Sequence, residues 1–106
     1  MGVGPVKHVV LFKFKDGVTE GTIAELIQGY KDLPGKIEGM KHFEWGADVS
    51  VENLTEGYTH CFITTFADAA ARDAYIPHPE HKKYVEVLFP NLEKVLVIDF
   101  VPEVVK

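Results

Sequence analysis

Strand-like and helix-like segments follow one another in one order along this chain, and that order constrains the fold more than any other feature. Four segments are rich in β-branched and aromatic residues, as strands are. They are Val6–Phe14, Lys41–Val49, Tyr58–Phe66 and Val95–Val101. One helical segment separates the first two strands, and a pair of helical segments separates the last two. This order predicts a ferredoxin-like α+β domain, βαββαβ, with an antiparallel four-stranded sheet.

The helical segments have recognisable starts. Thr19 is placed to cap the first helix, and Asp68 is placed to cap a short second helix. Pro79 suits the first turn of the third helix, which we expect Pro90 to kink. In the second strand, Gly46 is expected to form a bulge.

The helices of such a domain cover one face of the sheet, so apolar residues on the other face need a partner. The first strand carries apolar side chains on both faces, because Val10 and Phe12 alternate with Val9 and Leu11. A chain of 106 residues is also near the lower size limit for a self-sufficient core. We therefore expect a single domain over residues 1–106 that forms a homodimer, the two sheets closing a dimeric α+β barrel.

Composition argues against several classes of function. The formal net charge is −5 and no basic stripe interleaved with aromatic residues occurs, so nucleic acid is not an expected partner. No apolar run approaches membrane-spanning length and no signal peptide is recognisable, so we expect no membrane partner. The single cysteine, Cys61, cannot form an internal disulfide, which is typical of a reducing compartment. The sequence therefore predicts a cytoplasmic protein.

Histidines are the main candidates for chemistry. His8 and His60 lie at same-face positions of the first and third strands, which pair at the centre of this topology, so they are predicted to approach each other. Histidines in an apolar pocket suit acid–base catalysis near neutral pH. The alternative is that each is a hydrogen-bonded structural residue. Cys61 points away from His60 by strand alternation, which argues against a Cys–His nucleophile.

The segment YIPHPEH, from Tyr75 to His81, combines two histidines and a tyrosine with two prolines. The prolines restrict the backbone on both sides of His78, so the side chains are held in fixed directions. Tyr75 and His81 are then placed to face one cavity between helices and sheet. The alternative is a rigid corner between helices with no chemical role. His78 and His81 have no third ligand at a fixed spacing, which argues against zinc.

Several motifs, taken together, resemble a known family. They are GPVKHVVLFKFKDG, FEWGADVS, EGYTHCFITTF, YIPHPEH and KVLVIDF, in this order over nearly the whole chain. The sequence resembles the stress-responsive A/B barrel domain of plants. This group of dimeric α+β barrels includes heat-stable proteins, a polyketide cyclase and a hydroxynitrile lyase.

The resemblance implies roles for individual residues. In the cyclase branch, the catalytic pair matches Tyr75 and His81. Pocket residues that bind substrate match His8, Tyr30 and His60, and we expect His78 of the same corner to join them. In the lyase branch, the catalytic residues match His8 and Tyr30.

Some members of the family also bind magnesium at the dimer edge through main-chain carbonyls. The matching positions are Pro34, Ile37 and Met40. The nature of the side chain matters little at such a site, so the resemblance implies magnesium here as well.

The resemblance implies carbon–carbon bond chemistry without an organic cofactor. Our first expectation is a polyketide cyclase-like enzyme that closes a linear polyketide thioester by an aldol reaction, its small-molecule substrate lying in an apolar pocket. The alternatives are a hydroxynitrile lyase and a non-enzymatic, heat-stable, stress-protective dimer. A pocket blocked by Phe62, Phe89 or Leu92 would favour the last alternative.

Overall fold

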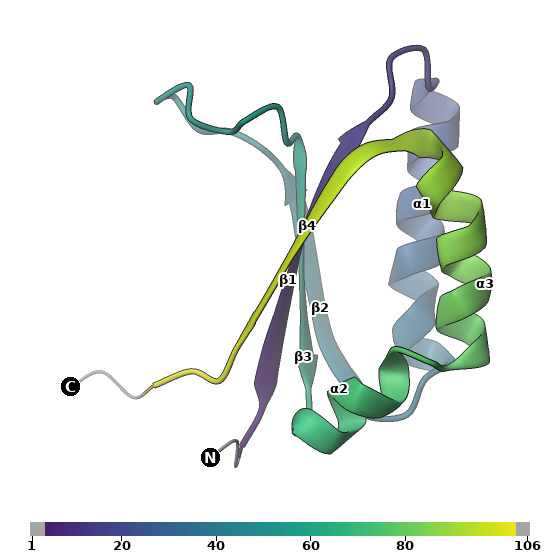
Figure 1. Cartoon of the computed structure of the whole chain (residues 1–106), viewed down its shortest axis with the longest axis vertical. Coiled ribbons are helices and arrows are strands. Elements are labelled where there is room, and N and C mark those ends of the chain that lie inside the picture. Colours follow the sequence, from purple (N-terminus) through teal and green to yellow (C-terminus); the bar gives the residue numbers. More distant parts are fainter. Residues whose placement is uncertain (1–3, 104–106) are drawn as a thin grey trace.

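All helices of the protein lie on one side of a single sheet (Figure 1). The computed structural model describes residues 4–103. The main elements are β1 (Val6–Phe14), α1 (Glu20–Asp32), β2 (Met40–Ala47), β3 (His60–Phe66), α2 (Ala69–Tyr75), α3 (Pro79–Leu88) and β4 (Leu92–Phe100). Two short 3-10 turns, η1 (Leu33–Gly35) and η2 (Phe89–Asn91), follow α1 and α3. The predicted ferredoxin-like order of strands and helices is confirmed.

The sheet has the strand order β2-β3-β1-β4, and every neighbouring pair is antiparallel. The central strand β1 buries every second residue against the helices. These residues are Val6, His8, Val10, Phe12 and Phe14. Because strand alternation is strict, the intervening residues face the other side of the sheet.

Side chains cap the free backbone N–H groups at the starts of the helices. The Thr19 hydroxyl accepts the Thr22 N–H at 3.1 Å, and the Asp68 carboxylate accepts the Ala71 N–H at 2.8 Å, so both predicted caps are confirmed. At α3 the cap is His78, which precedes Pro79. Its Nδ1 accepts the Glu80 N–H at 3.1 Å.

Two local predictions were wrong. Gly46 pairs in register with Cys61, and the irregularity in β2 lies between Met40 and Phe43, where the chain leaves the α1–β2 connection. Pro90 does not kink α3, because the helix ends at Leu88 and the proline lies in the following 3-10 turn. A 3-10 turn accommodates a proline without the steric clash that it causes inside an α-helix.

An aromatic core fills the space between sheet and helices. Phe12, Phe62 and Phe66 are at most 1% exposed, and each stabilises the fold by roughly 1.5–3 kcal/mol through burial. Tyr30 of α1 stacks on Phe62, with ring centroids 4.9 Å apart, and on Phe12 at 6.0 Å. This packing holds α1 over the centre of the sheet.

The other side of the sheet, which we call the open face, is covered by no helix of residues 4–103 (Figure 1). Its apolar side chains come from three strands and are Val9, Leu11, Ile63, Leu96, Ile98 and Phe100. Ile98 is 57% exposed and Phe100 49%. The loop between β2 and β3 and the segment after β4 extend from the sheet on this same side. No helix among residues 4–103 is long and apolar enough to cross a membrane.

Candidate active site

A cavity of about 290 Å³ lies between the helices and the helix-facing side of the sheet. Most of its lining is aliphatic or aromatic, and no Lys, Arg, Asp or Glu of residues 4–103 lines it. Its polar side chains come from β1 and from all three helices: His8, Tyr30, Tyr75, His81 and Tyr84. Few polar groups converging in an apolar cavity are typical of a small-molecule site.

Tyr75 and His81 are in contact in this cavity, with ring centroids 4.1 Å apart and ring planes inclined at 36°. Tyr75 is the last residue of α2 and His81 lies in the first turn of α3, so the proline-containing corner sets their separation. His81 Nδ1 is 2.9 Å from the Ile76 carbonyl oxygen. A carbonyl only accepts, so Nδ1 must carry the proton and Nε2 keeps its lone pair. The prediction that these two side chains share one cavity agrees with this geometry.

Burial sets the protonation of these groups. It lowers the pKa of His81 below its ordinary value of 6.5, so the imidazole is neutral at pH 7. Burial also raises the pKa of Tyr75 to about 12 and that of Tyr30 well above 10. Both phenols are therefore protonated hydrogen-bond donors at neutral pH. The pair thus offers a base in His81 and a donor in Tyr75.

Tyr84 has a structural task within the same cavity. Its hydroxyl donates to the Leu26 carbonyl oxygen at 2.6 Å and ties α3 to α1. Burial raises its pKa, so the phenol stays protonated and engaged. We therefore assign it no chemical role.

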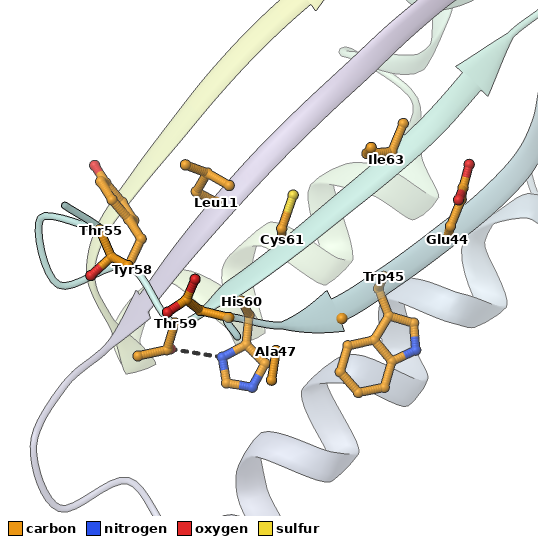
Figure 2. Close-up of a pocket in the computed structure, with 12 residues that line it drawn as sticks. Leu11, Glu44, Trp45, Ala47, Thr55, Tyr58, Thr59, His60, Cys61 and Ile63 are labelled. Carbon is orange, nitrogen blue, oxygen red and sulfur yellow. Dashed lines mark hydrogen bonds between the residues drawn. The ribbon is translucent and has the colours of Figure 1, made fainter. Parts of the chain in front are cut away.

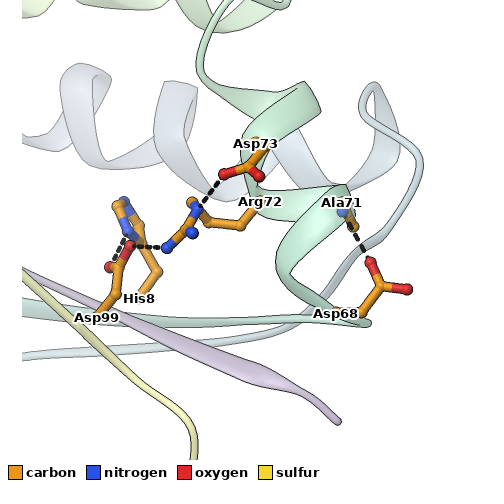
Figure 3. A network of polar contacts seen from close by, with 6 residues as sticks. All are labelled: His8, Asp68, Ala71, Arg72, Asp73 and Asp99. Atoms are coloured by element: carbon orange, nitrogen blue, oxygen red, sulfur yellow. Dashed lines mark hydrogen bonds and ion pairs between the residues drawn. The ribbon is translucent and has the colours of Figure 1, made fainter. Parts of the chain in front are cut away.

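His8 of β1 lines the cavity, and its imidazole also contacts a network of polar side chains (Figure 3). Its Nδ1 is 2.6 Å from Oδ1 of Asp99 on β4. The other oxygen of Asp99 accepts from Arg72 at 2.7 Å, and Arg72 also contacts Asp73 at 2.9 Å. The His8 ring meets Tyr75 edge-on, with centroids 5.6 Å apart. His8, Tyr75 and His81 therefore form one cluster.

Sequence reasoning did not find Asp99 or Arg72. A signal for Asp99 was available, because it is the one charged residue in the apolar segment VLVIDFV. Its significance depends on the register, which places it directly opposite His8. Nothing local marks Arg72, which lies on a short alanine-rich helix.

The structure does not bring His60 or His78 into this cavity. His60 shares a sheet face with His8, but it pairs with Phe12, whereas His8 pairs with Thr64. The two histidines are therefore four residues apart along the sheet, and the expected approach was wrong. The His60 ring packs edge-on against Phe14, with centroids 5.3 Å apart. His78 uses its imidazole as the cap of α3.

A second cavity, of about 360 Å³, lies beside the loop that joins β2 and β3 (Figure 2). Leu11, Cys61 and Ile63 point to one side of the strands there, while Trp45 and His60 point to the other. His60 Nδ1 is 2.7 Å from the Thr59 hydroxyl, and burial raises the pKa of the Cys61 thiol. A protonated thiol is a weak nucleophile. This cavity is the larger one, but two carboxylates, Glu44 and Asp48, line it and its histidine is already engaged by Thr59, so we place the candidate active site in the first.

The predicted magnesium ligands lie in the connection between α1 and β2. The Ile37 carbonyl already accepts the Met40 N–H at 3.4 Å, and Pro34 belongs to the preceding 3-10 turn. Within residues 4–103, no group of three or more His, Cys, Asp or Glu could hold a metal ion. Mg²⁺ is usually bound through one or two carboxylates together with water. The main-chain carbonyl site therefore stays a prediction, and no step below passes through a metal.

Comparison with known proteins places this arrangement in a family. The model of the Stress responsive A/B Barrel Domain matches residues 6–102. The chain belongs to this family. Among curated relatives, the stress-response A/B barrel domain-containing protein HS1 of Arabidopsis thaliana is 54% identical over 99 residues, which are 93% of this chain and 91% of HS1. Olivetolic acid cyclase of Cannabis sativa is 39% identical over 97 residues, 92% of this chain and 96% of the cyclase.

Two solved structures agree with the fold. The hydroxynitrile lyase from Passiflora edulis superposes with a TM-score of 0.89 at 26% identity, covering 97% of this chain and 98% of the lyase. A ferredoxin-like protein from Jannaschia, described as dimeric, superposes with a TM-score of 0.76 at 27% identity, covering 93% of this chain and all of that one.

Proposed function

We propose that this A/B barrel protein is a small-molecule enzyme of carbon–carbon bond chemistry, acting as a polyketide cyclase. The observation that carries the proposal is the contact between Tyr75 and His81 in an apolar cavity, with ring centroids 4.1 Å apart and His81 Nδ1 bound to a carbonyl. Its 39% identity to olivetolic acid cyclase supports the same class of reaction.

The reaction needs only proton transfer and charge stabilisation. Nε2 of His81 removes a proton from a methylene group flanked by carbonyls, and the electron pair moves onto the neighbouring carbonyl oxygen. The Tyr75 hydroxyl donates to that oxygen as it becomes negative. The enolate carbon then attacks a second carbonyl carbon of the same molecule, and the resulting alkoxide takes the proton back from His81. Side chains of this chain supply each of these roles without an organic cofactor.

The cavity favours an uncharged substrate with apolar surface. No charged side chain of the described residues lines it, so a charged group would lose hydration without compensation. Three apolar residues at its rim are each about half exposed: Ile76 at 53%, Phe89 at 52% and Val97 at 53%. Phe62 and Leu92, which could have blocked the space, do not line it. An open cavity favours the enzymatic over the purely protective function.

Hydroxynitrile lyase activity is the second candidate, and the His8–Asp99 contact of 2.6 Å favours it. With Nδ1 engaged by a carboxylate, Nε2 of His8 is free to accept the hydroxyl proton of a cyanohydrin. As the C–CN bond breaks, its electron pair leaves with cyanide and the carbonyl forms. Tyr30 would orient the substrate hydroxyl.

We also propose that the protein is a homodimer with the two open faces in contact. Half-exposed Ile98 and Phe100 on a face with no helix over it are the physical reason. The dimeric state of the Jannaschia relative supports this arrangement. A sedimentation mass of one chain at micromolar concentration would contradict it.

The test of the chemistry compares wild type with single variants on two substrates. For a linear tetraketide thioester, we expect His81→Gln to lower kcat by about 10²–10⁴-fold and Tyr75→Phe to lower it by about 10²-fold. The matched control is His78→Asn, which alters a histidine of the same corner outside the cavity and keeps a side chain able to cap α3. For mandelonitrile, His8→Gln is the decisive variant. If wild type turns over neither substrate faster than these variants do, the proposed chemistry is wrong.

A further inference from the structure

The Asp99 carboxylate is shared between two side chains from different parts of the fold. Oδ1 contacts His8 Nδ1 at 2.6 Å and Oδ2 contacts Arg72 at 2.7 Å (Figure 3). The side chains of Asp99 and Arg72 are only 22% and 24% exposed. We propose that Arg72, acting through Asp99, is a positioning residue that holds the His8 imidazole with Nδ1 toward Asp99 and Nε2 toward the cavity. This inference deepens the proposed function, since His8 lines the same cavity.

Asp99 fixes the orientation of the imidazole. A carboxylate only accepts hydrogen bonds, so His8 Nδ1 must donate to it. Since Nδ1 is occupied by Asp99, Nε2 is the nitrogen that a molecule bound in the cavity can meet. This is how a carboxylate selects one tautomer of a catalytic or ligand-binding histidine.

Arg72 fixes the position of the carboxylate. Its guanidinium binds the oxygen of Asp99 that does not face His8, which hinders rotation of the carboxylate away from Nδ1. Tyr75 from α2 contacts the His8 ring, and His81 from α3 lies in the same cavity. Both are neutral at pH 7, so the charged partners of this arrangement are Asp99 and Arg72.

The same ion pair joins two elements of the site. Arg72 lies one helical turn before Tyr75 on α2, whose one buried residue is Tyr75. Its contact with Asp99 spans 27 positions of sequence and ties this short helix to β4. One guanidinium therefore links the positions of Tyr75 and His8.

Imidazole ¹⁵N NMR of the full-length protein tests the proposal without any substrate. In wild type at pH 7, His8 should show one tautomer, protonated at Nδ1. In Arg72→Met, the carboxylate is free to turn away from Nδ1, and we expect a mixture of the Nδ1–H and Nε2–H tautomers. Arg72→Lys keeps the charge and should restore the wild-type behaviour.

Two further variants complete the test. Asp99→Asn should abolish the preference for one tautomer, and it keeps the proposal testable if Arg72→Met does not fold. Asp73→Asn is the matched control, because it removes the other carboxylate on Arg72 and leaves the contact with Asp99 intact. It should leave the His8 tautomer unchanged.

The outcomes separate this inference from the proposed function. If His8 keeps a single Nδ1–H tautomer in Arg72→Met or in Asp99→Asn, the positioning role is overturned whatever the activity. If the spectra behave as expected but wild type converts neither test substrate, the proposed chemistry fails and the positioning of His8 stands.

Discussion

Thr64 at the centre of β3 provides a sharp test of the packing around the candidate site. Its side chain is fully buried, and its hydroxyl has no hydrogen-bond partner among the described residues. The hydroxyl slightly lowers the pKa of the neighbouring Tyr30, but the two oxygens do not form a hydrogen bond of ordinary geometry. A buried hydroxyl without a partner destabilises a fold by about 1–3 kcal/mol.

We therefore expect Thr64→Val to stabilise the protein by about 1 kcal/mol. Valine keeps the branched shape and replaces the hydroxyl by a methyl group, which needs no partner. We take the lower end of the range because Tyr30 provides partial electrostatic compensation.

The adjacent Thr65 is a matched control of the same residue type on the same strand. It is 7% exposed, and its hydroxyl accepts from Lys7 Nζ at 2.7 Å. Thr65→Val removes that hydrogen bond and should lower stability by about 0.5–1.5 kcal/mol. The two substitutions, chemically identical and one position apart, are thus expected to have opposite signs.

Equilibrium urea unfolding followed by far-UV circular dichroism measures both effects. All proteins are compared at one concentration, because the stability of a dimer depends on it. If Thr64→Val unfolds at a lower urea concentration than wild type, its hydroxyl has a stabilising partner and the argument from burial is refuted.

Two further predictions concern backbone strain and pH. Gly39 has φ +89°, and a Cβ there would lie 2.8 Å from the Cβ of Ala71. Gly39→Ala should therefore lower the free energy of unfolding, measured in urea, by about 2 kcal/mol. Gly35 has open space around it, so the control Gly35→Ala should change the free energy of unfolding by less than about 0.5 kcal/mol. Burial lowers the pKa of His81 in the folded protein, so as the pH falls the unfolded chain takes up a proton on His81 before the folded protein does. Wild type should therefore lose stability as the pH falls below 6.5, and His81→Gln should lose less. The kcat/KM of the cyclisation should be constant as the pH is lowered to 6.5 and should fall only below pH 6.5. A fall that begins above pH 7 would contradict the assignment of His81 as the base.

Local sequence was sufficient to predict the strands, the helix starts and half of the candidate site. Periodicity located all four strands, and the side chains of Thr19 and Asp68 marked two helix starts, because caps act within three residues of chain. The pair Tyr75 and His81 could be predicted for the same reason. Both belong to one short corner whose prolines limit the backbone, so their neighbourhood depends little on the rest of the fold.

The other half of the site was decided by tertiary structure. Strand alternation shows which face a residue occupies, but it leaves the register between strands open. Only the register puts His8 opposite Asp99, 91 positions away, and His60 opposite Phe12 and outside the cavity. That register follows from packing the aromatic core beneath α1 and α3, a long-range requirement that no single segment contains. Arg72 then reaches Asp99 only because α2 folds back over the end of the sheet.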